Sequence, residues 1–176
     1  MLLNKPKVLL PVLVLLFLSL ITTASTAGTT AEAQSGAQTE HLTVYIHGLQ
    51  TNTDGSLKLI ADPVEWYEGA EADRIFAERE PEAAAEIGGA LDGYYIVNDS
   101  ETLSNYPVAA NAAVTMQIFD HTGKIEDLDI NWNESITLKK FTEEFAKTDV
   151  FDLSGSPYHL TIENGVITSI VQQYTP

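Results

Sequence analysis

The strongest constraint on the fold is an Asn-Gly dipeptide close to the C-terminus. Asn164-Gly165 separates two runs that are rich in β-branched and aromatic residues, 158–163 and 166–171. A two-residue hairpin turn needs positive φ at both positions, and Asn-Gly adopts this conformation readily. The sequence therefore predicts that the chain ends in an antiparallel β-hairpin.

Other segments predict further short strands. Apolar residues alternate with polar or amphipathic ones over 42–47, and the apolar character resumes over 57–60. Asp54-Gly55 supplies a turn between these segments, which predicts a second hairpin. Residues 94–97 and 114–118 also have strand-like composition or alternation, and 124–130 is expected to return as another strand. The domain is therefore expected to be rich in β-structure.

Helices are expected between the strands. The Ala- and Glu-rich segment 70–87 predicts two short helices that meet at Pro81, since proline starts a helix more readily than it continues one. Ser135 or Thr137 is expected to cap a further helix, and a loop is expected through Pro107. The expected class is α+β, with an antiparallel sheet or small open β-barrel interrupted by short helical excursions.

The N-terminus resembles an export signal. Two lysines precede an apolar run over 8–21, and small residues fill 22–27, which is the order of regions in a secretory signal peptide. The apolar run is shorter than the about 20 residues that cross a bilayer, so we expect a signal peptide over 1–27 rather than the alternative, an uncleaved anchor. A flexible tether over 28–40 and a single β-rich globular domain over 41–176 are expected to follow.

Composition limits the partners. The chain has no cysteine, which excludes disulfides, thiolate metal sites and a lipid-modified cysteine. Its formal net charge is −16, which disfavours nucleic acid and anionic membranes as partners. The acidity could attract cations or a basic partner, but a solvated surface is the preferred explanation. We expect a protein that is secreted or held at the extracellular face of the cell envelope, with no stable membrane span after signal removal.

An aromatic pair flanked by carboxylates is the main candidate for binding. Trp66 and Tyr67 could stack on a sugar or anchor a protein partner, whereas the alternative is that Trp66 closes one end of the core. The predicted end of strand 94–97 adds further polar and aromatic groups. The candidate binding residues are Asp62, Glu65, Trp66, Tyr67, Tyr95, Asn98 and Asp99.

An acidic segment is the candidate metal site. Residues 120–134 supply many oxygen ligands of the kind that calcium prefers. An EF-hand alignment fails, because Trp132 stands where glycine is needed and Leu138 where a glutamate is needed. An irregular calcium site remains open, and calcium is the one cofactor considered. Its candidate ligands are Asp120, Asp127 and Asp129.

The sequence assigns no catalytic residue. No Gly-x-Ser-x-Gly elbow is present, and the four histidines are scattered without the spacing of a zinc site. One enzymatic alternative is a hydrolase of wall polymers that uses paired carboxylates, with Glu65 and either Asp99 or Asp62 as acid and base.

Several strings together carry a family resemblance. The string Asp62-Pro63-Val64-Glu65-Trp66, the segments 95–99 and 158–162, and the Asn164-Gly165 turn resemble uncharacterised exported proteins and lipoproteins of Gram-positive bacteria. The resemblance implies an extracytoplasmic location and a β-rich shape, and it implies no activity. This chain differs from the lipoproteins in lacking the lipidation cysteine.

These observations favour a non-enzymatic accessory or binding domain whose partner is a cell-envelope component or another protein. The two alternatives are the wall-polymer hydrolase and a calcium-stabilised structural domain.

Overall fold

The computed structural model describes residues 38–100 and 102–176, so the predicted signal peptide and most of the predicted tether lie outside the described residues. The strands are β1 (Thr39–Thr51), β2 (Leu57–Glu68), β3 (Tyr94–Val97), β4 (Ser104–Ile118), β5 (Ile130–Ile136), β6 (Pro157–Glu163) and β7 (Val166–Gln172). The α-helices are α1 (Gly69–Arg79), α2 (Pro81–Ile87) and α3 (Leu138–Phe145). No helix in this part of the chain is long and apolar enough to cross a bilayer.

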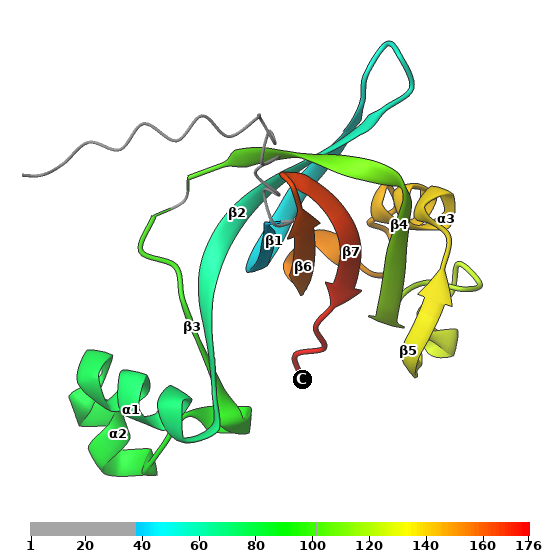
Figure 1. Cartoon of the computed structure of the whole chain (residues 1–176). Coiled ribbons are helices and arrows are strands. Elements are labelled where there is room, and N and C mark those ends of the chain that lie inside the picture. Colours follow the sequence, from blue (N-terminus) through cyan, green and yellow to red (C-terminus); the bar gives the residue numbers. More distant parts are fainter. Residues whose placement is uncertain (1–37, 101) are drawn as a thin grey trace, which may run out of the picture. The chain divides into compact units, whose positions relative to one another are not determined.

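Five of the strands close into a barrel (Figure 1). Strand β1 pairs with β2 and β6, β6 pairs with β7, β7 pairs with β4, and β4 returns to β2. Every pairing is antiparallel except that of β4 with β7. This is the topology of five-stranded Greek-key barrels such as the OB-fold. The expected α+β class with a small barrel is confirmed, and the barrel is closed.

Two strands extend the sheet beyond the barrel. Strand β3 pairs with the last residues of β2, whereas β5 pairs with the last residues of β4. Strand β2 thus uses its first half as a barrel wall and its second half as one side of a two-stranded ribbon. We call the paired segments Glu65–Glu68 and Tyr94–Val97 the β2–β3 ribbon.

The predicted hairpins and helices are present. Asn164 and Gly165 have φ values of 51° and 82°, and the strands on either side pair as predicted. The β1–β2 hairpin is also confirmed, and Figure 1 shows its turn projecting beyond the barrel. Helices α1 and α2 meet at Pro81, and the Thr137 side chain accepts a hydrogen bond from the Lys140 amide at the start of α3.

Two local expectations are wrong. Pro107 lies inside β4, opposite Lys58, and not in a loop. At that point β4 pairs with β2 alone, and one-sided pairing tolerates a residue without an amide hydrogen. The expected strand over 124–130 is replaced by a short 3₁₀ turn at Ile125–Asp127, and the strand itself begins at Ile130.

Helix α3 packs its aromatic side onto the barrel core. The Phe141 ring is fully buried and contacts the rings of Phe145 and Tyr158 at 5.7 and 5.9 Å between centroids. The buried Tyr158 hydroxyl donates to the Leu153 carbonyl at 2.9 Å, and burial raises the pKa of Tyr158 well above its usual range. These rings connect α3 and the barrel in one apolar cluster.

Replacing Phe141 with alanine is expected to lower the free energy of unfolding by about 3–5 kcal/mol, because it removes a fully buried ring and leaves a cavity. Urea unfolding followed by circular dichroism measures the change. The control is Lys139→Ala on the same helix, where the side chain is 86% exposed and a change within about 0.5 kcal/mol is expected. Equal effects of the two substitutions would contradict the assigned core.

Candidate functional site

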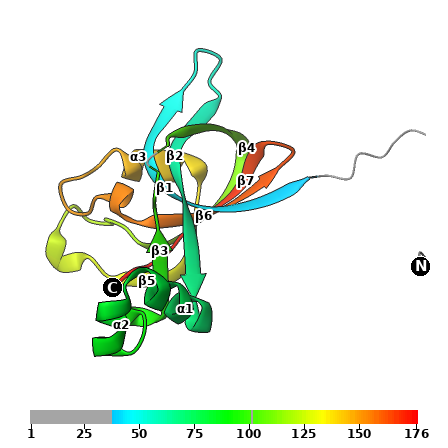
Figure 2. The ribbon, with the colours of Figure 1, turned by 90° about the vertical axis from the view of Figure 1, so that its left-hand side faces the viewer.

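The β2–β3 ribbon carries most of the predicted binding residues. Its register places Tyr67 opposite Tyr95 and Glu68 opposite Tyr94. Because successive side chains of a strand point to opposite faces, the predicted residues are divided between two sides of the ribbon. Figure 2 shows α1 and α2 at the end of β2 where the ribbon lies.

One face of the ribbon packs toward α1. The Tyr95 ring contacts Phe76 of α1 at 5.4 Å, and its hydroxyl donates to the Glu80 carboxylate at 2.5 Å. The Tyr67 hydroxyl donates to the Glu65 carboxylate at 2.6 Å. These hydrogen bonds raise the pKa values of both tyrosines above the usual range. The contacts of Tyr95 thus hold α1 against this face of the ribbon.

The same face holds an ion pair. Arg79 at the end of α1 donates two hydrogen bonds, of 2.8 and 2.6 Å, to the Asp99 carboxylate. The hydrogen bonds from this guanidinium lower the pKa of Asp99. Glu65, Asn98 and Asp99 line one pocket of about 180 Å³, so three of the predicted residues are brought together.

The geometry of this pocket gives little support to paired-carboxylate hydrolysis. Such a reaction needs one carboxyl group that keeps its proton and serves as general acid. The hydrogen bonds from Arg79 lower the pKa of Asp99, which favours its ionised form, and Glu65 accepts a hydrogen bond from Tyr67. Asp99 is therefore poorly suited to serve as the acid.

The Asp62 side chain is buried and hydrogen-bonded within the fold. Asp62 is only 2% exposed, and Asn98 donates to its Oδ2 atom at 2.6 Å. The Oδ1 atom has no hydrogen-bond partner among the described residues. This contact fastens the end of β3 to β2 and helps to set the position of the ribbon.

The Asn98→Ala substitution is expected to reduce the free energy of unfolding by about 1–3 kcal/mol, because both oxygens of the buried Asp62 carboxyl group then lack a partner. The change is measured by urea unfolding. Asn105→Ala, at an exposed position of β4, serves as the control with little expected effect. Unchanged stability of the Asn98 variant would show that the contact does not hold the ribbon.

The opposite face of the ribbon carries an aromatic stack. The rings of Trp66 and Tyr94 lie 4.7 Å apart and are nearly parallel, with an interplanar angle of 9°. The His159 ring of β6 contacts Trp66 edge-on at 5.6 Å, and the Trp66 indole N–H donates to Glu68 at 2.8 Å. Trp66 is half-buried here and is not part of the barrel core cluster, which does not favour the alternative in which it closes one end of the core.

A pocket of about 430 Å³ lies beside this stack, between the ribbon and the C-terminal segment. Asp92 and Gly93, with φ values of 59° and 75°, turn the chain sharply into β3 at the edge of the pocket. We call this pocket the aromatic pocket. The residues that line it include Trp66, Glu68, Asp92, Tyr94, Gln173 and Tyr174.

Sequence reasoning found only part of the aromatic pocket. It placed Trp66 in a binding surface and named Tyr95 as a partner, whereas Tyr94 is the tyrosine that stacks on Trp66. The alternation of side chains along 94–97 could have separated the two tyrosines, because only one of them shares a face with Trp66. His159 and Tyr174 come from the other end of the chain, and no local pattern connects them with Trp66.

The predicted metal ligands serve the turn after β4. The Asp120 carboxylate accepts from the amides of Thr122 and Gly123 at 3.0 and 2.6 Å, and Asp127 accepts from the Thr122 hydroxyl at 3.0 Å. Asp129 accepts from the amide of the next residue at 2.8 Å. Within residues 38–100 and 102–176, no three carboxylate or histidine side chains gather as a metal site requires.

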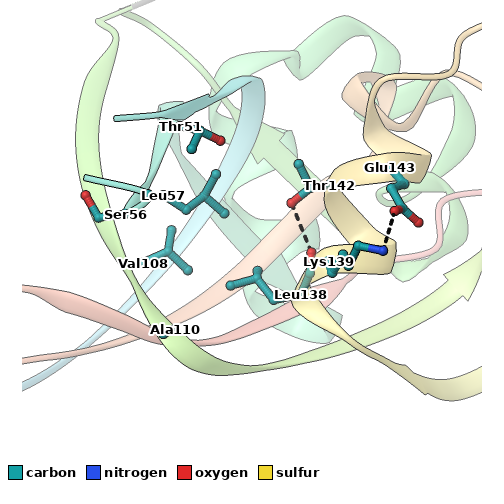
Figure 3. Close-up of a pocket in the computed structure, with 10 residues that line it drawn as sticks. Thr51, Ser56, Leu57, Val108, Ala110, Leu138, Lys139, Thr142 and Glu143 are labelled. Carbon is teal, nitrogen blue, oxygen red and sulfur yellow. Dashed lines mark hydrogen bonds and ion pairs between the residues drawn. The ribbon is translucent and has the colours of Figure 1, made fainter. Parts of the chain in front are cut away.

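A larger pocket, of about 510 Å³, lies between the β1–β2 turn, β4 and α3 (Figure 3). Leu57, Val108 and Leu138 form its apolar surface. The polar groups at its rim are engaged with each other: the Thr142 hydroxyl donates to the Leu138 carbonyl, and Lys139 pairs with Glu143 at 3.1 Å. The pocket therefore offers an apolar surface with few polar groups free to orient a ligand.

Comparisons with protein-family models, curated proteins and solved structures found no match to this chain.

In an Arg79→Leu variant, the pKa of Asp99 is expected to rise toward its ordinary value of about 3.9. Because the folded state lowers this pKa, the ion pair stabilises the fold above the ordinary value and the contribution is lost as the pH falls through the lowered one. Carboxyl ¹³C NMR titration measures the shift, and Lys139→Leu on α3 is the control. An Asp99 titration that is identical in wild type and variant would contradict the ion pair.

Proposed function

We propose that this protein is a non-enzymatic binding domain of the cell exterior, and that its ligand binds in the aromatic pocket. The stacked pair of Trp66 and Tyr94 is the observation that carries the proposal. Aromatic rings supply most of the contact energy in many binding sites, and two half-buried rings at the edge of a pocket leave surface for a ligand.

The chemistry of the pocket selects the kind of ligand. Its lining contains the carboxylates of Glu68 and Asp92 and no lysine or arginine. The whole chain is also strongly acidic, with a net charge of −16. An anionic ligand would be repelled both by the pocket carboxylates and by the net negative charge of the chain, so a neutral or positively charged ligand is supported.

A cell-envelope component is the proposed partner. The predicted signal peptide and the absence of cysteine support a protein that works outside the cytoplasm and is not lipid-anchored. Polymers of the envelope present many copies of one ligand group, which suits a small domain that binds through the aromatic pocket. The hydrolase alternative has less support, because the Glu65 carboxyl group accepts a hydrogen bond from Tyr67 and the Asp99 carboxylate accepts hydrogen bonds from Arg79.

Co-sedimentation of the purified protein with an insoluble cell-wall preparation from Gram-positive bacteria tests this proposal. Trp66→Ala and Tyr94→Ala are each expected to weaken binding about tenfold, the factor that corresponds to about 1.4 kcal/mol of lost ring contact. Circular dichroism and thermal melting check that both variants stay folded.

Leu103→Ala is the control, since it shortens an apolar side chain that lies away from the pocket, ahead of β4, and is 51% exposed. Wall binding by this variant is expected to equal that of the wild type. If both pocket variants bind the wall as well as the wild type, the aromatic pocket is not the binding site.

A further inference from the structure

A second aromatic pair lies along the C-terminal segment. The rings of Trp132 and Tyr174 meet edge-to-face at 5.6 Å. Trp132 is 65% exposed, which is unusual for the largest apolar side chain. Tyr174 lines the aromatic pocket and also a neighbouring pocket of about 220 Å³, so the two pockets adjoin at this residue.

The exposed position of Trp132 is held by a buried network. The next residue, Asn133, has a φ of 59°, and its amide donates to the side chain of Gln117 at 2.8 Å. Gln117 is only 7% exposed, and the pairing of β4 with β5 shifts register at this point. A strained residue and a buried amide thus fix the backbone that holds Trp132 at the surface.

The two aromatic pairs are connected by fixed contacts. His159 touches Trp66 and forms a hydrogen bond of 3.2 Å with the side chain of Gln173. The Gln173 amide also donates to the Pro157 carbonyl at 2.8 Å, which fastens the C-terminal segment to β6. Tyr174 follows directly and contacts Trp132. The surface therefore carries a track of aromatic rings that runs from Tyr94 and Trp66 to Tyr174 and Trp132.

A track of this kind matches the chemistry of a sugar chain. The apolar faces of successive sugar rings pack on aromatic rings, and their hydroxyl groups donate to carboxylate and amide oxygens such as those of Glu68, Asp92 and Gln173. Neither adjoining pocket contains lysine or arginine in its lining, so acidic groups on the ligand would be unpaired.

We propose that the ligand is a linear glycan without acidic groups, which lies along the C-terminal segment and contacts both aromatic pairs. This inference rests on the proposed function, because it names the ligand class for the same pocket and extends the site to Trp132. Contact at two separated pairs has a measurable consequence: a chain long enough to reach both pairs binds more tightly than a short one.

Tryptophan fluorescence titration of the purified full chain tests the inference. The probes are β-1,4-linked N-acetylglucosamine and glucosamine oligomers, each from the disaccharide to the hexasaccharide, with oligogalacturonates as acidic chains of similar length. Affinity for the first two series is expected to rise with length by about tenfold and then level off, and the acidic series is expected to bind at least about tenfold more weakly.

Substitutions in the two aromatic pairs identify the residues that cause the increase of affinity with oligomer length. Trp132→Ala is expected to abolish the increase with length, whereas Trp66→Ala weakens binding of every length, the disaccharide included. Ile125→Ala is the control, since this residue is 64% exposed against 65% for Trp132. Its length dependence is expected to match that of the wild type.

The outcomes separate the two proposals. If wall binding depends on Trp66 but neither non-acidic series binds, or affinity does not change with length, the glycan inference is wrong and the binding pocket stands. If the acidic series binds as tightly as the others, the charge argument is wrong. If Trp66→Ala alters neither wall binding nor oligomer binding, the proposed function fails as well.

Discussion

Strand β2 takes part in two structures along its length, and the remaining architecture depends on this division. Residues 57–61 pair with β4 and close the barrel, whereas residues 65–68 pair with β3 outside it. A single strand thus fixes the ribbon relative to the barrel wall. The Asn98–Asp62 hydrogen bond lies between the two paired regions and fastens β3 at the point of divergence. Without this continuity, Trp66 would not be held beside His159 of β6.

The two faces of the ribbon have different tasks. The face toward α1 uses its tyrosines and Asp99 in hydrogen bonds to carboxylates and to Arg79, so its polar groups are paired within the molecule. The face toward the C-terminal segment keeps aromatic surface at the edge of a pocket. Strand alternation alone produces this separation, and it lets a small domain combine a structural face and a binding face within four residue pairs.

Local chemistry made much of the fold predictable. The Asn164-Gly165 turn, the Asp54-Gly55 turn and the break at Pro81 each depend on neighbouring residues only, and all three predictions are confirmed. The position of Pro107 could not be predicted locally, because a proline fits inside β4 only where one edge of that strand is unpaired. Barrel closure and the parallel pairing of β4 with β7 are likewise long-range results.

The candidate site, like the fold, was predictable where it depends on neighbouring residues and not where it depends on long-range pairing. Trp66 stands out in the sequence because an aromatic pair flanked by carboxylates is uncommon, but its neighbours are set by the topology. His159 and Tyr174 reach the pocket only because β6 pairs with β1 and the C-terminal segment is fastened to β6. The orientation of Trp132 depends on a bulge and on a left-handed asparagine, and neither has a signal in a single sequence.

The pairing of β1 with β6 also has a consequence for the timing of folding. Thr43 and His159, which share a hydrogen bond, are separated by 116 positions in the chain. A chain synthesised from its N-terminus cannot complete this pairing until its last strands exist, and pairings between such distant segments form slowly. During that interval the polypeptide has no closed barrel, and β1 lacks the strand that pairs with one of its edges.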